Sequence, residues 1–279
     1  MNILILGGGG REHALAWAIR QNPKCDRLVV APGNAGIAGV AECADLDILN
    51  EEDVATFAAE NAIDLVVVGP EAPLAAGVAD VLRAAGLSVF GPSQAAAQLE
   101  ASKTFTKEVC DAAGAPTAAW ARFDDLNHAL DYIRVQGAPI VVKADGLAAG
   151  KGVTVAETLE DAENALRALF EDDGAEVVIE EFMTGEEASF FVLCDGTTTL
   201  PIGTSQDHKR VGEGDTGPNT GGMGAYSPAP VLTDEITAKV MDQIVTPTLA
   251  EMSRRGTPFS GVLYVGLMIE DGAPRLVEY

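Results

Sequence analysis

Over the first 90 residues, short apolar runs alternate with stretches whose apolar positions recur at helical spacing. The runs have the length of strands and are bounded by Gly or Pro. Strands that alternate with helices in this way predict a doubly wound parallel sheet. The expected strands are 3–6, 27–30, 64–68 and 88–90, and the expected helices are 11–21, 51–61 and 73–85.

Each of these strands is followed by a loop rich in glycine or proline. Ligands of open α/β sheets bind at the edge where the strands end. The sequence therefore predicts a ligand site at this edge, near loops 7–10, 31–36, 69–73 and 91–93.

The pattern changes at Ser102, a helix cap followed by a helical stretch that stops at Gly114 and Pro116. Strands beyond this point pair through hairpins as well as helices, so we place a domain boundary near residue 100, with domains at 1–100 and 101–279. Thr158 and Asp161 predict a further helix start. The other elements expected are strands 140–144, 153–156, 177–182, 188–194, 262–269 and 275–279 and a helix at about 233–252, with a hairpin turn at Asp271 and Gly272.

Composition narrows the class of protein. Hydrophobic residues make up 47% of the 279 residues, which excludes a disordered chain. No apolar run approaches the roughly 20 residues that cross a bilayer, and the first residues lack a signal peptide's basic region, so we expect a cytosolic protein. A net charge of −24 disfavours nucleic acid and membranes as partners, and we expect small-molecule substrates and a monomer. The four cysteines have no metal-ligand spacing and are expected to be reduced, buried thiols.

The segment 207–228 combines ionisable side chains with many glycines. Glycine is unfavourable in helices and strands, so we expect a loop here. Lys209 and Arg210, with the carboxylates of Asp207 and Asp215, are able to hold a small charged molecule. A plain surface loop is the alternative.

A second glycine-rich segment, Gly7-Gly-Gly-Gly-Arg-Glu-His13, follows a strand and opens a helix. The N–H groups and dipole of a helix start accept phosphate. Glu12 stands where the third glycine of a dinucleotide motif belongs, which argues against NAD. A monophosphate site with Arg11 and His13 and a tight turn with solvated charges both remain open.

Gly146-Leu-Ala-Ala-Gly-Lys-Gly152 is similar to a P-loop, but Gly152 replaces the Ser or Thr of that motif and both flanks read as strands. We therefore expect a glycine hairpin. Lys151 at its tip and Lys143 on the preceding strand are placed to neutralise a polyphosphate. A plain turn with a surface lysine is the alternative.

Two acidic positions complete the candidate chemistry. In the segment 180–187, which joins two strands, a carboxylate just beyond a short connector is able to accept both ribose hydroxyls while the connector backbone reads adenine, although acidic turns are usually only solvated. Glu278 in the last strand is able to hold Mg²⁺ between phosphates, or else faces solvent.

Taken in order, the segments 7–13, 69–74, 143–152, 180–182 and 207–228 closely resemble the glycinamide ribonucleotide synthetase family of ATP-grasp enzymes, along the whole chain. The resemblance implies a Rossmann-like parallel-sheet domain followed by an ATP-grasp α+β domain with a glycine-loop lid subdomain at about 117–187. It also implies ATP-dependent condensation of glycine with 5-phosphoribosylamine through glycyl phosphate, a step of purine biosynthesis that uses ATP and Mg²⁺ or Mn²⁺.

The family pattern also implies roles for residues of this chain. The expected catalytic residues are Lys143, Lys151, Asp207 and Lys209, and the expected metal ligand is Glu278. ATP contacts are expected from Lys103, Lys143, Gly146, Gly150, Lys151 and Gly152 at the phosphates, from Glu180, Glu181, Phe182 and Met183 at adenine, and from Glu187 at ribose. Contacts to the phosphoribosyl group are expected from Gly9, Gly10, Arg11, Gly69, Pro70 and Glu71, and contacts to the acceptor side and glycine from Asp207, Lys209, Asp215 and Asn219.

The chain departs from the family pattern at its end. In the family, the strand matching 276–279 continues with an Asn that shares Mg²⁺ with Glu278, then with an Arg-containing loop and a further domain. We therefore expect a shortened chain with little or no turnover by itself. The alternatives are another ATP-grasp carboxylate–amine ligase and a nucleotide-sensing module without catalysis; the lysines at 103, 143 and 151 favour an enzyme.

Overall fold

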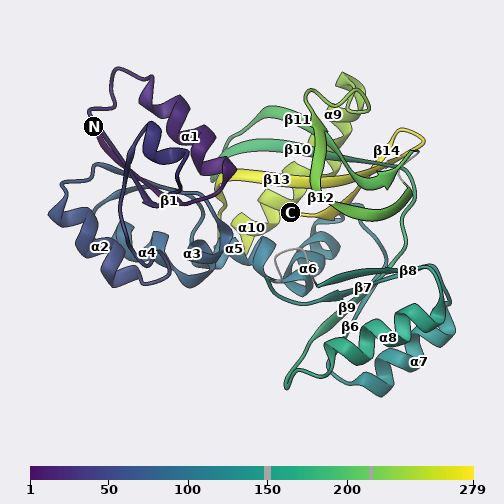
Figure 1. Ribbon diagram of the computed structural model, residues 1–279. Helices are drawn as coiled ribbons and strands as arrows, with labels where there is room; N and C mark the ends of the chain where they lie inside the picture. Colours follow the sequence, from purple (N-terminus) through teal and green to yellow (C-terminus); the bar gives the residue numbers. More distant parts are fainter. Residues whose placement is uncertain (148–151, 214–215) are drawn as a thin grey trace. The chain divides into compact units, whose positions relative to one another are not determined.

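The computed structural model describes residues 1–147, 152–213 and 216–279, with the backbone alone at 209–210 and 216–223. The chain forms two compact units: unit 1 is built on a parallel sheet, and unit 2 on two further sheets (Figure 1). Unit 1 comprises Met1–Ala101 and Gly256–Gly261, and unit 2 comprises Ser102–Arg255 and Val262–Tyr279.

Unit 1 is built on a five-stranded parallel sheet in the order β3-β2-β1-β4-β5. The chain order reverses between β1 and β4, as in a doubly wound sheet, which confirms the predicted architecture. The strands are β1 (Asn2–Gly7), β2 (Arg27–Pro32), β3 (Glu42–Cys43), β4 (Leu65–Val68) and β5 (Ser88–Phe90).

Both faces of this sheet are covered, and in Figure 1 β1 runs between α1 and the other helices of the unit. Side chains alternate between the faces, so Ile3 and Ile5 pack toward α1 while Leu4 and Leu6 pack toward α2 and α4. Burial on both faces explains why these strands are continuous apolar runs. The helices are α1 (Gly10–Arg20), η1 (Ile37–Gly39), α2 (Glu51–Glu60), α3 (Glu71–Ala76), α4 (Val78–Ala84) and α5 (Gln94–Ala101).

One helix prediction in unit 1 is wrong. The stretch 73–85 is not a single helix, because α3 and α4 meet at Gly77, whose φ is +98°. That left-handed conformation interrupts a right-handed helix. The strand β3 and the helix α5 were not predicted: two residues are too few for a periodic pattern, and the alanine-rich α5 has little contrast between its faces.

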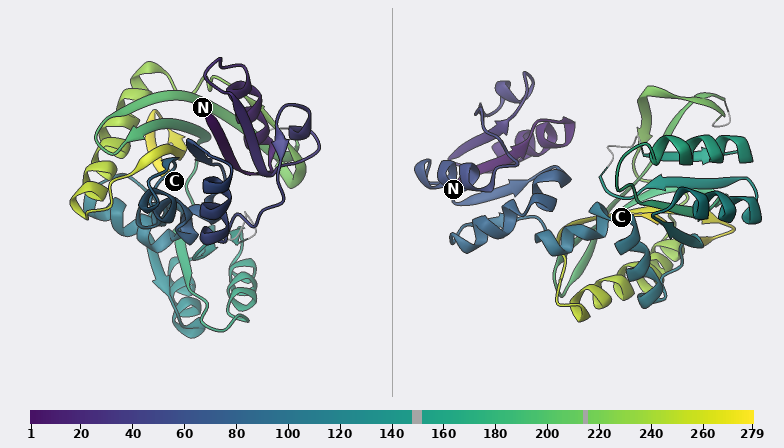
Figure 2. Two further views of the ribbon diagram at one scale, coloured as in Figure 1. Left: turned by 90° about the vertical axis from the view of Figure 1, so that its left-hand side faces the viewer. Right: turned by 90° about the horizontal axis from the view of Figure 1, so that it is seen from below.

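Unit 2 contains a four-stranded antiparallel sheet in the order β6-β9-β7-β8. Helices α7 and α8 lie side by side over one face of it in Figures 1 and 2 and bury Ile133 and Leu166 against Ile179. The predicted cap of α8 is confirmed, since Thr158 Oγ1 accepts the Asp161 N–H. The elements are β6 (Trp120–Phe123), α7 (Leu126–Gln136), β7 (Ile140–Ala144), β8 (Val153–Ala156), α8 (Leu159–Leu169) and β9 (Val177–Glu181).

A larger sheet of unit 2 has the order β12-β11-β10-β13-β14. The predicted turn between β13 and β14 is confirmed, with φ of +50° at Asp271 and +75° at Gly272. The predicted helix 233–252 is three consecutive segments, because a π-helical turn separates two α-helices. The remaining elements are α6 (Lys103–Ala113), β10 (Glu186–Asp195), β11 (Thr199–Gly212), β12 (Thr216–Tyr226), α9 (Asp234–Val240), η2 (Met241–Val245), α10 (Thr246–Arg254), β13 (Ser260–Glu270) and β14 (Ala273–Glu278).

The expected loop at 207–228 is wrong. Most of this segment belongs to β11 and β12, which form an antiparallel pair with Gln206 opposite Tyr226 and Asp207 opposite Ala225. The hydrogen bonds of a strand pair come from the backbone, so a glycine-rich segment forms a strand where a partner is present.

Across the described ranges, no helix is long and apolar enough to cross a membrane. The four cysteines, all of them described, are free thiols. Cys25, Cys110 and Cys194 are buried as predicted, whereas Cys43 is exposed, contrary to the prediction. Cys43 lies in β3, at the edge of the parallel sheet, where fewer neighbours cover a side chain.

Candidate active site

Two turns of unit 1 lie where the strand order reverses. The paired strands β1 and β4 end at Gly7 and Val68, and their next residues lead into α1 and α3. Ligands of open sheets bind at this position. The structure brings the following predicted residues to this edge of the sheet: Gly9, Gly10, Arg11, Gly69, Pro70 and Glu71.

A buried carboxylate, that of Glu12, organises these turns. Glu12 is 3% exposed, its Oε2 accepts the Gly9 N–H at 2.7 Å, and its Oε1 accepts Arg11 Nε at 2.9 Å. Arg11 also donates to Glu71 Oε1 at 2.9 Å, so it bridges the two turns. The structural role of Glu12 was not predicted, although a Glu at the third position of a helix is a known capping signal.

Glycine is required at two positions around this carboxylate. A Cβ at Gly69 would lie 2.3 Å from Glu12 Oε1, and a Cβ at Gly7 would lie 2.6 Å from Glu12 Cγ. Both distances are far below van der Waals contact. These glycines therefore allow the close approach of a protein side chain.

Arg11 is a cation with two carboxylate partners and a half-exposed side chain. Burial acts to lower the pKa of Arg11, but the hydrogen bonds that Arg11 donates to Glu12 and Glu71 outweigh it and raise the pKa. An anion at the start of α1 would meet the exposed Gly10 backbone and the exposed part of this guanidinium.

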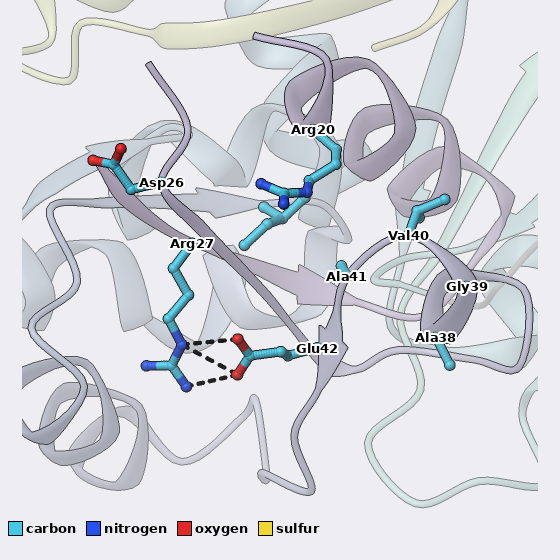
Figure 3. Close-up of a pocket in the computed structure, with 9 residues that line it drawn as sticks. Arg20, Asp26, Arg27, Ala38, Gly39, Val40, Ala41 and Glu42 are labelled. Carbon is cyan, nitrogen blue, oxygen red and sulfur yellow. Dashed lines mark hydrogen bonds and ion pairs between the residues drawn. The ribbon is translucent and has the colours of Figure 1, made fainter. Parts of the chain in front are cut away.

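A hollow of about 300 Å³ lies elsewhere in unit 1, around the first residues of β2 (Figure 3). Most of its charged side chains have partners: Arg27 donates to Glu42 at 2.7 and 3.1 Å, as the dashed lines of Figure 3 show, and Asp26 binds the amino terminus. Arg20 donates to the Cys25 carbonyl at 3.4 Å. Because no predicted site residue lines this hollow, we assign it no ligand.

The central feature of unit 2 is a carboxylate shared by two lysines. Glu180 of β9 accepts Lys143 of β7 at 2.9 Å through Oε1 and Lys107 of α6 at 3.1 Å through Oε2. Glu180, Lys143 and Lys107 are 3%, 5% and 2% exposed. Ion pairs removed from water hold their partners strongly, because separation would leave a buried charge unpaired.

Lys107 was missed in the sequence analysis. Its Nζ also donates to Thr117 Oγ1 at 2.7 Å, and the Thr117 hydroxyl donates to the Leu276 carbonyl at 2.8 Å. Burial lowers the pKa of Lys107, and the charge of Glu180 opposes this shift. A lysine within a helix is usually expected to face solvent. Lys107 instead lies on the buried face of α6, which the sequence pattern did not indicate.

Lys103 begins α6 and is tied to the start of the glycine hairpin. Its Nζ donates to the Gly146 carbonyl at 2.9 Å. Asp145 Oδ1 accepts the backbone N–H of Lys103 at 2.6 Å and that of Gly146 at 2.9 Å. Asp145 therefore joins two predicted phosphate-binding segments that are distant in the sequence.

Glu278, the predicted metal ligand, is one of the charges that act on Lys103. Burial lowers the pKa of Lys103, and the positive charge of Lys143 lowers it further. The negative charges of three carboxylates oppose this shift, those of Asp145, Glu278 and Glu180. Among the described residues, no three His, Cys, Asp or Glu side chains are grouped to hold a metal ion. Mg²⁺ at nucleotide sites is held by one or two carboxylates together with phosphates, and the exposed carboxylate of Glu278 beside a lysine fits that donor set.

The side chains of the predicted adenine connector have mixed environments. The side chain of Glu181 pairs with Arg275, while Phe182 is 39% exposed and Met183 is buried. Glu187 is an exposed residue of β10 and lies beyond the connector, as predicted. With the carboxylates at 180 and 181 bound to protein groups, the backbone at 182–183 is the part of the connector that suits a ligand.

The remaining predicted residues are less completely described. Gly152 is buried immediately before β8, and Asp207 lies on β11. The backbones of Lys209 and Asn219 lie on β11 and β12. Gly150, Lys151 and Asp215 lie outside the described residues.

Comparison with known protein families covers the whole chain. Residues 1–100 match the N domain of phosphoribosylglycinamide synthetase, and residues 101–279 match its ATP-grasp (A) domain. A phosphoribosylamine–glycine ligase of Mesorhizobium japonicum is 61% identical over 283 residues, which cover 100% of this chain and 67% of that protein. The ligase of Vibrio parahaemolyticus is 57% identical over 288 residues, again covering 100% of this chain and 67% of the relative. The chain thus spans about two thirds of these relatives' length.

Solved structures agree with this result. The crystal structure of phosphoribosylamine–glycine ligase from Thermotoga maritima aligns with a TM-score of 0.84 at 29% identity, covering 100% of this chain and 68% of that one. N5-carboxyaminoimidazole ribonucleotide synthetase from Thermus thermophilus aligns with a TM-score of 0.71 at 21% identity, over 99% of this chain and 70% of that one, and shows the fold alone. The expected family is confirmed: the chain belongs to the phosphoribosylglycinamide synthetase family of ATP-grasp ligases.

Proposed function

We propose that the full-length protein joins glycine to 5-phosphoribosylamine at the expense of ATP, forming glycinamide ribonucleotide, ADP and phosphate. The observation that carries the proposal is the grouping of Lys103 and Lys143, two cations held in place by Gly146 and Glu180. Fixed cations are what phosphoryl transfer requires, because catalysis consists mostly of positioning and charge neutralisation. The family match along the whole chain supports the choice of substrates.

The reaction proceeds in two steps. A glycine carboxylate oxygen attacks the γ-phosphorus of ATP, the bond to the β-phosphate oxygen breaks, and ADP leaves. The amine nitrogen of phosphoribosylamine then attacks the carbonyl carbon of glycyl phosphate, loses a proton, and displaces phosphate. In this scheme Asp207 and Lys209 act on the acceptor side, with Asp215 and Asn219 beside them.

Unit 2 supplies the nucleotide contacts in this proposal. The side chains of Lys103 and Lys143 bind phosphate oxygens, and the backbone at 182–183 contacts adenine. Glu278 would hold Mg²⁺ or Mn²⁺, which when bound supplies charge neutralisation at the phosphates. The other proposed contacts are Gly146, Gly150, Lys151 and Gly152 at the phosphates and Glu187 at ribose.

Unit 1 supplies the phosphoribosyl contacts. The exposed start of α1 and the guanidinium of Arg11 are complementary to a monophosphate. Glu12 and Glu71 keep that guanidinium in one orientation. The proposed contacts are Gly9, Gly10, Arg11, Gly69, Pro70 and Glu71.

The test is ADP release by the full-length protein with Mg-ATP, glycine and freshly generated phosphoribosylamine, each omitted in turn. We expect ADP only when all three are present, and loss of ADP release in Lys143→Met. Turnover with a different acid or amine would retain the ATP-grasp assignment and reject the substrates. ATP binding without turnover under every condition would favour a sensing module.

A further inference from the structure

The buried group formed by Lys107, Glu180 and Lys143 contains two cations and one anion. Each carboxylate oxygen of Glu180 binds a different lysine, so the group as a whole carries one positive charge. A pair made of Lys143 and Glu180 alone would be neutral. The second lysine therefore determines whether Lys143 acts on a ligand as part of a cation or as part of a neutral pair.

Lys107 is not placed to touch a ligand itself. It is 2% exposed, and Thr117 and Glu180 accept two of its three donor hydrogens. Cys110 of the same helix is also close, but burial raises the pKa of its thiol to about 12, so it adds no charge at neutral pH. The ionised groups that face Lys107 are Glu180 and Lys143.

The anchoring of Lys107 fixes the orientation of the carboxylate. Thr117 donates in turn to the Leu276 carbonyl of β14, so Lys107 is held by a second partner in addition to Glu180. A carboxylate with one oxygen fixed in this way presents its other oxygen to Lys143 in one direction. In metal sites, residues that orient the ligands commonly change affinity or activity by about 10- to 100-fold when they are removed, and Lys107 supports Lys143 through Glu180 in a comparable way.

We propose that Lys107 is a positioning residue for the triphosphate: it holds Glu180 and balances its charge, so that the ammonium of Lys143 stays oriented and acts as a net cation. The inference deepens the proposed function, because it rests on Lys143 binding ATP. It predicts that Lys107 affects ATP without contacting it.

The experiment measures the Kd of Mg-ATP by calorimetry in the full-length protein, together with KM for ATP and for glycine. Lys107→Met leaves the pair of Glu180 and Lys143 neutral, and we expect Kd and KM for ATP to rise about tenfold or more, with KM for glycine unchanged at saturating ATP. The double variant Lys107→Met/Glu180→Gln restores the single positive charge, and we expect it to bind ATP about tenfold more tightly than Lys107→Met.

Two results would overturn the inference: wild-type ATP affinity in folded Lys107→Met, or a double variant that binds as weakly as that single variant. If Lys107→Met does not fold, the double variant is measured by itself, because it also removes the carboxylate that Lys107→Met deprives of one of its two cations, and the amide oxygen of Glu180→Gln still accepts a hydrogen bond from Lys143. The double variant must then bind ATP about tenfold more tightly than Lys143→Met does. If these two variants bind ATP equally weakly, the inference is rejected. Wild-type ATP affinity in Lys143→Met would instead reject the proposed nucleotide site, so the two failures are distinguishable.

Discussion

At the scale of single residues, Glu12 and the glycines that surround it shape the first turn of unit 1. The carboxylate is held by the Gly9 N–H and by Arg11, and it fits only because Gly7 and Gly69 lack side chains. A helix start of this kind has one backbone N–H already used by the protein. The groups left for a phosphate are the exposed backbone at Gly10 and the Arg11 guanidinium.

The substitution Gly69→Ala tests this arrangement. A Cβ 2.3 Å from Glu12 Oε1 must displace the carboxylate, so we expect unit 1 to lose roughly 1–3 kcal/mol of unfolding free energy. We also expect a higher KM for phosphoribosylamine in the full-length protein. Urea unfolding followed by Trp17 fluorescence, in a Trp120→Phe background, reports on unit 1. Gly39→Ala is the matched control, because its Cβ would meet nothing within 4 Å. Equal stability of the two variants would contradict the prediction.

A second residue-scale prediction concerns pH. Arg254 and Arg255 donate to Glu251 at 2.6 and 2.8 Å and lower its pKa from 4.5 to about 2. A carboxyl whose pKa is lower in the folded state stabilises the fold fully above its unfolded pKa, and that stabilisation is lost as the pH falls from 4.5 toward 2. Glu251→Gln should therefore be less stable than wild type at neutral pH, and the difference should shrink at low pH.

Urea unfolding at about pH 6 and about pH 3 measures this difference, with Trp120 fluorescence in a Trp17→Phe background reporting on unit 2. The exposed Glu60→Gln in unit 1 is the control. A stability difference between Glu251→Gln and wild type that stays constant over this range would show that the two arginines do not act through the charge of Glu251.

At the scale of elements, the cap at the start of α8 is expected to contribute measurably to the stability of unit 2. Thr158 Oγ1 accepts the Asp161 N–H at 3.1 Å, and Asp161 Oδ2 accepts the Thr158 N–H at 3.2 Å. Thr158→Ala removes the hydroxyl, and we expect a loss of about 0.5–2 kcal/mol in the unfolding free energy of unit 2. Thr158→Ser retains the hydroxyl and should stay close to wild type. The fluorescence of Trp120, in β6 of the four-stranded sheet of unit 2, reports the unfolding. An unchanged urea midpoint in Thr158→Ala would refute the role of the cap.

At the scale of the whole molecule, the proposed ligands divide between the two units. The nucleotide residues lie in unit 2 and the phosphoribosyl residues in unit 1. Hydrogen exchange in the full-length protein separates the two sites. A non-hydrolysable Mg-ATP analogue should slow exchange in α6, β7 and β9, and ribose 5-phosphate should slow it at the turns after β1 and β4. Protection of the unit 1 turns by the nucleotide analogue alone would contradict this division.

The sequence by itself determined the features that depend on near neighbours along the chain. The parallel sheet of unit 1, the hairpin between β7 and β8, the cap at Thr158 and the turn at Asp271 and Gly272 were all predictable. Each depends on periodicity or on residues within one turn, whose energies are local. The family was also evident, because its motifs are contiguous strings of residues.

Only the tertiary structure decided the features that depend on partners distant in the sequence. Most of the described part of 207–228 forms strands because β11 and β12 pair there, and backbone pairing outweighs the poor strand preference of glycine. The Glu12 carboxylate fits between the two turns because Gly69, which follows β4, leaves room for it. Lys107 became part of the site because α6 turns it toward Glu180 on β9. A buried charge is stable only with its partner, and that partner is set by packing, which no local pattern contains.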